Sequence, residues 1–300
     1  MDRRKFLTIA GTAAAARAAG IPIVDTHIHL FDPGRPQGVP WPPKDNAVLY
    51  RPALPARYRA LTEGLGIAGA IEVECSPWIE DNQWVLDLAA KDKIIVGTVG
   101  NLDPADPEFA RQLARFHRNP RFRGIRYGNL WGRDLRSDMG KPGFVDGLKL
   151  LAQSGLALDM ANPDPALIRA AIAVTDRIPG LRVVMDHLPQ MDPSLARADL
   201  RELAARPQVY VKISQVLRRL DGRVPEDLAF YRDRLDEVCG LFGEDRVLYG
   251  SDWPNSDQWA PYRTVFRVVH EYFMAQGPVA AEKYFHRNSI AAYKLDVFVG

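Results

Sequence analysis

The sequence is poor in cysteine, in net charge and in long apolar runs. Its two cysteines, Cys75 and Cys239, are too few for a disulfide framework, which a chain of 300 residues does not need. The formal net charge is +2 at pH 7, so no strong field points to nucleic acid or to an anionic membrane. No apolar run after residue 20 is long enough to span a bilayer. These absences argue against a disulfide-stapled domain, a nucleic-acid-binding protein and a stable membrane anchor.

The first twenty residues differ in character from the rest of the chain. Arg3 and Arg4 precede an Ala-rich, weakly apolar stretch, a pattern that resembles a twin-arginine export signal. We therefore predict a signal segment over residues 1–20 and a periplasmic or otherwise exported protein. The alternative is a disordered or amphipathic start of a cytoplasmic protein. We assign the fold to residues 21–300.

Short apolar runs and longer helical patterns alternate from residue 21 onwards. The runs are rich in Val, Ile and Leu without clear alternation, as expected of strands that are covered on both faces. Eight such repeats in a chain of this length favour a closed parallel (β/α)₈ barrel, a TIM barrel, as a single domain. The predicted strands are Ile21–Thr26, Ala68–Val73, Ile94–Val99, Phe122–Arg126, Leu156–Met160, Arg182–Asp186, Val209–Ile213 and Arg246–Tyr249.

The segments between the strands place apolar residues at three- and four-residue steps, which predicts helices. One segment, 33–55, has seven prolines and cannot form a regular helix. We interpret it as an ordered loop over the barrel mouth, with a mobile surface loop as the alternative. The predicted helices are Glu80–Ala90, Pro107–Arg118, Gly143–Gln153, Ala166–Ile178, Pro193–Ala205 and Pro225–Phe242.

Polar side chains follow the predicted strands, where the active sites of such barrels form. His27 and His29 end the first strand, and alternation along an extended chain points them the same way. Two imidazoles on one side suit a metal ion or an oxygen anion. His187 follows the sixth strand and Asp252 the eighth. The barrel therefore predicts one site that gathers these four residues.

Three motifs resemble the amidohydrolase superfamily: VDTHIHLFDP, VVMDHLP and VLYGSDWP. They occur in the expected order on the expected strands, and the resemblance extends from about Ile21 to Leu295. More narrowly, the chain is similar to the branch that holds sugar-acid lactonases and 2-pyrone-4,6-dicarboxylate lactonase. The resemblance implies that Asp252 activates the attacking water. It also implies that the histidines surround the reacting carbonyl or a metal bound to it.

The chain departs from the metal-rich members of that superfamily. The fifth strand has no histidine, and the fourth offers Arg126, which cannot ligate a metal. We therefore expect no two-metal site. A single divalent ion, zinc or manganese, on His27, His29 and Asp252 is one alternative. Catalysis without a metal is the other, and the missing histidine inclines the interpretation slightly toward it.

A second set of residues is predicted to bind the substrate, a small molecule of anionic or sugar-like character. The Arg126 fork matches a carboxylate, with an ion pair inside the barrel, to Glu74 or Asp159, as the alternative. Trp253 and Trp131 suit the lining of a ring-binding pocket, although packing is the commoner role of such rings. The predicted substrate-binding residues are Arg126, Glu74, Asn162 and Trp253.

Three hypotheses follow for the activity. The first is hydrolysis of a small sugar-acid or carboxylated lactone by water that Asp252 activates. The second is a metal-dependent decarboxylase or C–C hydrolase of the same superfamily, acting on an aromatic or enol acid. The third is a barrel that binds a ligand without chemistry, against which the presence of three histidines and an aspartate argues. Substrate identity, metal requirement, oligomeric state and signal cleavage point lie beyond these patterns.

Overall fold

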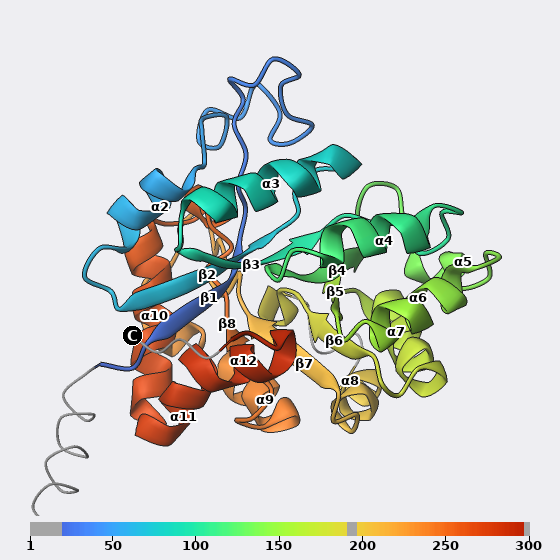
Figure 1. Ribbon diagram of the computed structural model, residues 1–300. Helices are drawn as coiled ribbons and strands as arrows, with labels where there is room; N and C mark the ends of the chain where they lie inside the picture. The colour runs from blue at the N-terminus through green and yellow to red at the C-terminus, as the bar shows by residue number, and fades with distance from the viewer. Residues whose placement is uncertain (1–19, 191–196, 297–300) are drawn as a thin grey trace, which may run out of the picture.

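Eight parallel strands, each hydrogen-bonded to the next in chain order, form the centre of the protein (Figure 1). The computed structural model describes residues 20–190 and 197–296, so nearly all of the predicted signal segment lies outside the described residues. The strands are β1 (Ile23–Ile28), β2 (Ile67–Val73), β3 (Ile95–Gly100), β4 (Phe122–Gly128), β5 (Ala157–Ala161), β6 (Arg182–Met185), β7 (Val209–Ile213) and β8 (Val247–Tyr249). All eight predicted strands are present, with ends within two residues of the predicted ones.

The last strand meets the first, which closes the sheet into a barrel. The backbone N–H of His29 donates to the carbonyl of Trp253 at 2.7 Å, and that of Asp252 donates to the carbonyl of His27 at 2.8 Å. The Thr26 hydroxyl donates to the Tyr249 carbonyl at 2.6 Å. The (β/α)₈ barrel predicted from the sequence is therefore confirmed.

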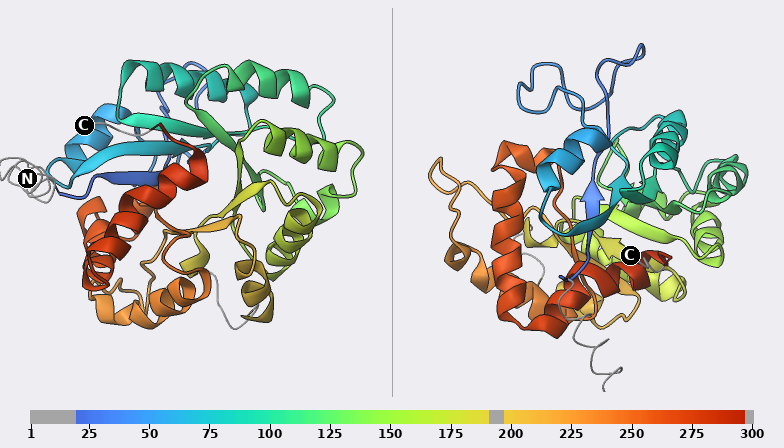
Figure 2. Two further views of the ribbon diagram at one scale, coloured as in Figure 1. Left: turned by 60° about the horizontal axis from the view of Figure 1, so that its bottom comes forward. Right: turned by 60° about the vertical axis from the view of Figure 1, so that its left-hand side comes forward.

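Helices surround the barrel (Figure 2), and the longer ones, such as α7 and α10, bury an apolar face. The α-helices are α2 (Pro55–Thr62), α3 (Ile79–Lys91), α4 (Phe109–His117), α5 (Leu135–Asp138), α6 (Phe144–Gln153), α7 (Pro165–Arg177), α8 (Arg197–Ala204), α9 (Arg232–Phe242), α10 (Tyr262–Ala275), α11 (Pro278–Glu282) and α12 (Asn288–Tyr293). Shorter helical turns are η1 (Leu188–Gln190), η3 (Leu228–Phe230), η4 (Asn255–Gln258) and η5 (Lys283–Arg287).

The starts of two predicted helices need comment. The helix predicted from Pro225 begins at Arg232, because the Asp227 side chain caps a separate short turn by accepting from the Ala229 N–H. The helix predicted from Pro193 is described from Arg197, and residues 191–196 lie outside the described residues. No helix within the described ranges is long and apolar enough to cross a membrane.

The Pro-rich segment 33–55 rises beyond the end of β1, where Figure 1 draws it as a dark blue loop. Its two ends are tied together, because Phe31 and Ala53 exchange backbone hydrogen bonds of 3.1 and 2.9 Å. Trp41 folds back edge-on toward His29, with ring centroids 5.7 Å apart. The segment is therefore an ordered loop at the carboxyl end of the strands. We call residues 33–55 the mouth loop.

Candidate active site

A cavity of about 170 Å³ opens at the carboxyl ends of the strands. Its wall combines two tryptophans, three amide side chains, two imidazoles, one carboxylate and one guanidinium. The lining residues are His29, Trp41, Cys75, Arg126, Leu130, Trp131, Asn162, His187, Gln215, Asp252 and Asn255. This is the end of the barrel at which the sequence placed the chemistry.

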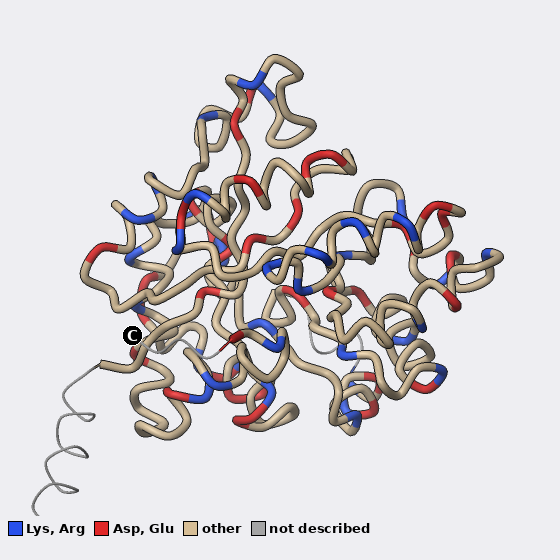
Figure 3. Tube along the Cα trace, viewed as in Figure 1, with Lys and Arg blue, Asp and Glu red and all other residues tan. Residues whose placement is uncertain are grey.

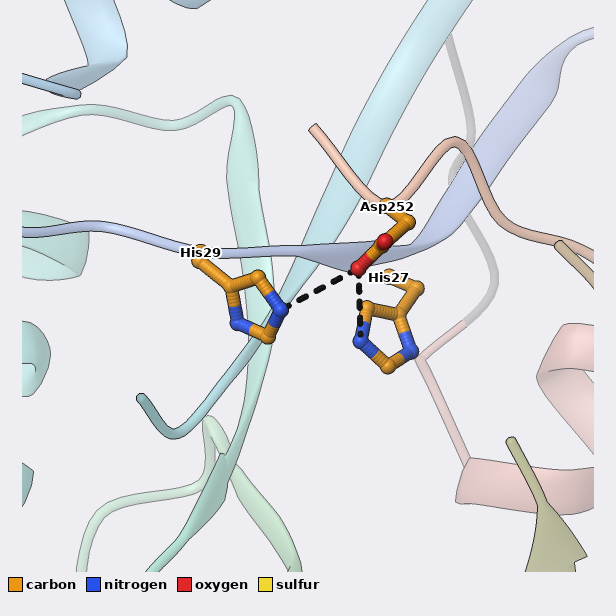
Figure 4. A group of neighbouring side chains, drawn as sticks. All are labelled: His27, His29 and Asp252. Atoms are coloured by element: carbon orange, nitrogen blue, oxygen red, sulfur yellow. Dashed lines mark hydrogen bonds and ion pairs between the residues drawn. The ribbon is translucent and has the colours of Figure 1, made fainter. Parts of the chain in front are cut away.

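Three imidazoles converge on one oxygen of Asp252. Nε2 of His29 lies 3.2 Å from Oδ1 of Asp252, Nε2 of His27 lies 3.5 Å from it, and Nε2 of His187 lies 3.7 Å from it. Figure 4 shows His27 of β1 and His29, just after the end of that strand, both pointing toward Asp252. The structure therefore brings together the four residues that the motifs single out.

Glycine at position 250 allows β8 to approach β1 this closely. A Cβ at Gly250 would stand 2.9 Å from the Cβ of His27, closer than real Cβ atoms come. The next residue, Ser251, donates its backbone N–H to the buried Asp25 carboxylate at 2.8 Å. Asp25 also accepts hydroxyl hydrogen bonds from Tyr58 and Tyr262, at 2.9 and 3.0 Å. This buried carboxylate therefore fixes the backbone next to Asp252.

Five non-glycine residues that line the cavity have left-handed backbone conformations. Such conformations cost an L-residue about 1–2 kcal/mol and recur at functional sites. One residue comes from each of the loops that follow β4 to β8, so every one of these loops turns sharply as it reaches the cavity. They are Trp131 (φ 56°), Asn162 (φ 53°), His187 (φ 52°), Gln215 (φ 50°) and Asp252 (φ 59°). The strain is an indication of function that is independent of the motifs.

The electrostatics of the cluster keep Asp252 ionised and the deeper imidazoles neutral. Burial alone would raise the pKa of Asp252, but the imidazoles of His187, His29 and His27 outweigh it and hold that pKa well below its usual range. Burial lowers the pKa of His187 to about 4. Burial and then the Lys212 charge lower the pKa of His27 well below its ordinary value. At neutral pH the carboxylate therefore faces two uncharged imidazoles, those of His27 and His187.

The hydrogen bonds of His29 identify which of its nitrogens carries a proton. Its Nδ1 lies 2.7 Å from the carbonyl oxygen of Val73, which only accepts, so Nδ1 is protonated. In a neutral ring Nε2 then presents a lone pair to the Asp252 carboxylate. The Nε2 lone pair and the Asp252 oxygen, 3.2 Å apart, would repel each other, so this contact requires a cation between or beside the two atoms. The cation is either a proton on His29 or a bound metal ion.

The donor set fits a divalent metal. His27, His29 and Asp252 each offer one ligand atom, and these atoms lie within 4.8 Å of one another. Ligands of a tetrahedral zinc ion stand about 3.4 Å apart, close to the separations between the imidazoles and Oδ1. Among the described residues, the buried Nε2 of His27 also has no hydrogen-bond partner. Imidazole and carboxylate are ligands that zinc and manganese accept.

Two of the predicted substrate-binding residues line the cavity. Arg126 lies at the wall, but its Nε donates to Asp186 at 2.9 Å, so its partner is not Glu74 or Asp159 as the alternative predicted. Its Nη1 donates to the backbone carbonyl of Glu74 at 3.2 Å. Asn162 is held by reciprocal amide–backbone hydrogen bonds with Asn129, at 2.9 and 3.0 Å.

The other two predicted substrate-binding residues do not line the cavity. The Trp253 side chain is fully buried and packs against Tyr58, with ring centroids 5.4 Å apart. Glu74 accepts from Nε1 of Trp131 at 3.0 Å and from the backbone of Ser76 at 3.0 Å. Glu74 therefore orients Trp131, and it is Trp131, not Trp253, that faces the cavity. The assignment of Trp253 and Glu74 to substrate binding stays a prediction, which their positions outside the cavity wall do not favour.

Sequence reasoning missed the amides closest to Asp252. Gln215 and Asn255 each donate to Oδ2 of Asp252 at 2.7 Å. Their only signal in the sequence is position, since Gln215 follows the end of β7 and Asn255 lies three residues after Asp252. Burial raises the pKa of the Cys75 thiol well above its ordinary value, so this cavity residue is a poor nucleophile.

A barrel with a histidine–aspartate centre at the carboxyl ends of its strands is the arrangement of a hydrolase site with room for one metal ion. The model of the Amidohydrolase family matches residues 24–295, and the chain belongs to that family.

The curated relatives include the L-fucono-1,5-lactonase of Burkholderia ambifaria. It is 28% identical over 286 residues, which cover 91% of this chain and 96% of that protein. A zinc-bound amidohydrolase from Burkholderia multivorans shares the fold with a TM-score of 0.80 and 24% identity, over 92% of this chain and 100% of the other. A putative 2-pyrone-4,6-dicarboxylic acid hydrolase from Pseudomonas putida matches with a TM-score of 0.73 and 23% identity, over 93% and 99%.

Proposed function

We propose that this protein hydrolyses a small, neutral sugar-acid lactone. The observation that carries the proposal is the convergence of three imidazoles on Oδ1 of Asp252 at the floor of the cavity. The curated L-fucono-1,5-lactonase, which aligns over nearly the whole chain, supports a lactone as the substrate. The cavity volume of about 170 Å³ suits a single sugar-sized ring.

The residues of the cavity have distinct roles in the proposed reaction. Asp252 is ionised, and its Oδ1 accepts the proton of the water that attacks the lactone carbonyl carbon. The ring C–O bond then breaks, and the leaving alkoxide takes up the proton that Asp252 has accepted, which gives an open hydroxy acid and restores the carboxylate. Trp41 and Trp131 flank the substrate ring, and the amides of Asn162, Gln215 and Asn255 bind its hydroxyl groups.

We further propose that His27, His29 and Asp252 hold one divalent metal ion, zinc or manganese. The fixed Nδ1 proton of His29 supports this, because it leaves the Nε2 lone pair facing Asp252. A strongly stabilised carboxylate is a weak base, which a metal compensates by acidifying the water and polarising the carbonyl. Catalysis by imidazolium donors without a metal is the alternative, and it requires a protonated His29.

The charge at the cavity favours a neutral substrate over a dicarboxylate. Among the described residues, Arg126 is the only lysine or arginine that lines the cavity, and Asp186 pairs with it at 2.9 Å. Asp252 adds a negative charge to the same wall. A substrate with two carboxylates therefore meets one cation that is already neutralised, whereas the lining amides and tryptophans suit hydroxyl groups and a sugar ring. Along the described chain, Figure 3 shows basic and acidic residues interspersed, with no segment of one sign standing apart.

The substrate prediction is tested with matched lactones. We expect kcat/KM for sugar-acid 1,5-lactones to exceed that for a carboxylated pyrone by about a hundredfold or more, because each buried unpaired charge costs several kcal/mol. Acid release from both kinds of lactone is followed with a pH indicator. A carboxylated lactone that is opened as fast as the neutral one would mean that Arg126 binds a substrate carboxylate. A panel in which no lactone is opened would contradict the proposed function itself.

The metal prediction is tested by elemental analysis of protein grown without added metal. We expect about one zinc or manganese per chain, and a loss of activity on chelation that either metal restores. His29→Ala should lower the bound metal to a small fraction of the wild-type amount. Metal-free protein with full activity would instead establish the imidazoles as hydrogen-bond donors. A bound metal together with CO₂ release from an aromatic acid would establish the decarboxylase alternative.

A further inference from the structure

The second oxygen of the Asp252 carboxylate is fully occupied by amides. Oδ2 accepts from Nε2 of Gln215 and from Nδ2 of Asn255, both at 2.7 Å. These two donors come from different loops, one after β7 and one after β8. Because Oδ2 is held in this way, the carboxylate cannot rotate without breaking two short hydrogen bonds. Oδ1 is thereby aimed at the imidazoles.

One of these amides is the end of a longer chain of amides. Oδ1 of Asn255 accepts from Nε2 of Gln258 at 2.7 Å, and Oε1 of Gln258 accepts from Nδ2 of Asn46 at 3.2 Å. Every amide in this chain donates in the same direction, toward the carboxylate. Hydrogen bonds that are aligned in this way polarise one another and strengthen the last bond, here the one to Asp252.

The far end of the chain lies in the mouth loop and is fixed there. Oδ1 of Asn46 accepts from the backbone N–H groups of Val48 and Leu49 at 3.2 and 3.0 Å, so its Nδ2 must point outward to Gln258. The Arg219 guanidinium, from the loop after β7, donates to the Gln258 carbonyl at 3.0 Å. Three loops from distant parts of the sequence therefore meet at Gln258.

We propose that Asn46, Gln258 and Asn255 form an amide relay that couples the mouth loop to the orientation of Asp252. Asn46 and Gln258 are positioning residues, since neither lines the cavity. The mouth loop thereby forms part of the catalytic apparatus as well as covering the cavity. The proposal rests on the proposed lactone hydrolysis only for its kinetic readout, because the coupling itself is a property of the folded chain.

Two substitutions interrupt the relay without disturbing the cavity wall. Asn46→Asp keeps the oxygen that caps the turn at Val48 and Leu49 but removes the Nδ2 donor. Gln258→Leu keeps the side-chain volume but removes all three side-chain hydrogen bonds of Gln258, one from Asn46 and two to Asn255. We expect each to lower kcat about three- to tenfold, the value of a neutral hydrogen bond, and to leave KM within about twofold. Gln276→Leu, at an exposed glutamine that caps the C-terminal end of α10 and does not line the cavity, is the matched control and should behave as wild type.

A double-mutant cycle distinguishes a relay from a general loss of structure. In an Asn255→Ala background, Gln258→Leu should lower kcat no further, because the Asn255 amide through which Gln258 acts on Asp252 is already absent. In a Gln215→Ala background, Gln258→Leu should lower kcat by the same factor as in the wild-type protein, since Gln215 donates to Oδ2 independently of Gln258. Equal effects of Gln258→Leu in both backgrounds, or a rise in KM alone, would contradict the relay.

Hydrogen exchange gives a second readout that needs no substrate. Coupling is reciprocal, so Asn255→Ala should increase deuterium uptake several-fold in the peptide that contains Val48 and Leu49. Uptake in helix α4, which is remote from the relay, should not change. If wild-type protein opens no lactone but the exchange result holds, the proposed function fails and the relay stands. If uptake in the mouth loop is unchanged by Asn255→Ala, the relay is refuted whatever the activity.

Discussion

Asp252→Asn is expected to lower kcat by about 10²–10⁴-fold, the contribution of a positioned general base, with a further loss where a metal ligand is removed. Asparagine has the size of aspartate, and its amide oxygen still accepts from Gln215 and Asn255. Its amide group then faces the ring nitrogens of the histidines as a donor. The variant should therefore fold normally while it loses the proton acceptor.

The measurement is steady-state lactone hydrolysis, with a thermal melt to show that the variant is folded. Asp146→Asn makes the same chemical change at an exposed position of α6, and His117→Asn removes an exposed imidazole of α4. Both should retain wild-type rates, whereas His187→Asn should cost heavily. An Asp252→Asn variant with activity within a few-fold of wild type would show that another group activates the water. Equal ligand affinity with no turnover in wild type and variant would favour a binding protein.

The four central residues could be located from the sequence because a barrel imposes one rule on all its strands. Polar residues just after apolar strands must meet at one end, so His27, His29, His187 and Asp252 required only correct strand ends. The strands themselves were visible because buried parallel strands are short and uniformly apolar. Helix α10 was missed, although its buried residues recur with helical spacing.

The cavity wall was harder to predict because it depends on backbone turns that carry no sequence signature. Asp252 has a φ of 59°, and this left-handed turn sends the following Trp253 into the core. Trp131, also in a left-handed conformation, faces the cavity instead. Likewise, nothing in the sequence indicates that the Glu74 carboxylate accepts a hydrogen bond from Trp131, and the role of Glu74 in substrate binding stays a prediction.

The sequence also does not show which charged side chains form ion pairs inside the barrel. Arg126 of β4 lies in register with Asp159 of β5, yet it pairs with Asp186, which follows β6, the next strand but one. Asp159 pairs instead with Lys212, whose ammonium also approaches Asp186 at 3.0 Å and Nδ1 of His27 at 3.2 Å. Side-chain length and direction decide these pairs, and strand order alone does not.

Lys212 is the residue whose removal should destabilise the protein most. Its side chain is fully buried, and its Nζ donates to Oδ2 of Asp159 at 2.6 Å. Without Lys212, Asp186 still pairs with Arg126. Among the described residues, the Asp159 carboxylate then accepts a hydrogen bond only from the Tyr293 hydroxyl, at 2.8 Å. Removing one partner of a buried ion pair costs about 3–5 kcal/mol, so we expect Lys212→Met to lower the free energy of unfolding by that amount. The melting temperature should fall by on the order of 10 °C.

The loss of stability in Lys212→Met should depend on pH, and the pKa of the buried Asp159 carboxyl sets the direction of that dependence. Burial, partly offset by Lys212, raises the pKa of Asp159 to about 6 from 3.8, and loss of the ammonium raises it further. Between the unfolded and folded pKa values the folded chain binds the extra proton, so stability falls as pH rises. The variant should therefore be closer to wild type at pH 5 than at pH 8.

Two further variants separate a buried charge from a simple packing defect. Lys149→Met removes an exposed ion pair with Asp146 and should change stability by less than about 0.5 kcal/mol. Lys212→Met combined with Asp159→Asn should recover part of the loss, because the unpaired carboxylate is gone. Urea unfolding of the four proteins at both pH values measures these differences. A double variant no more stable than Lys212→Met, with a loss that is equal at both pH values, would mean that Lys212 stabilises the barrel by filling space, and the charge network beneath the histidines would be incidental.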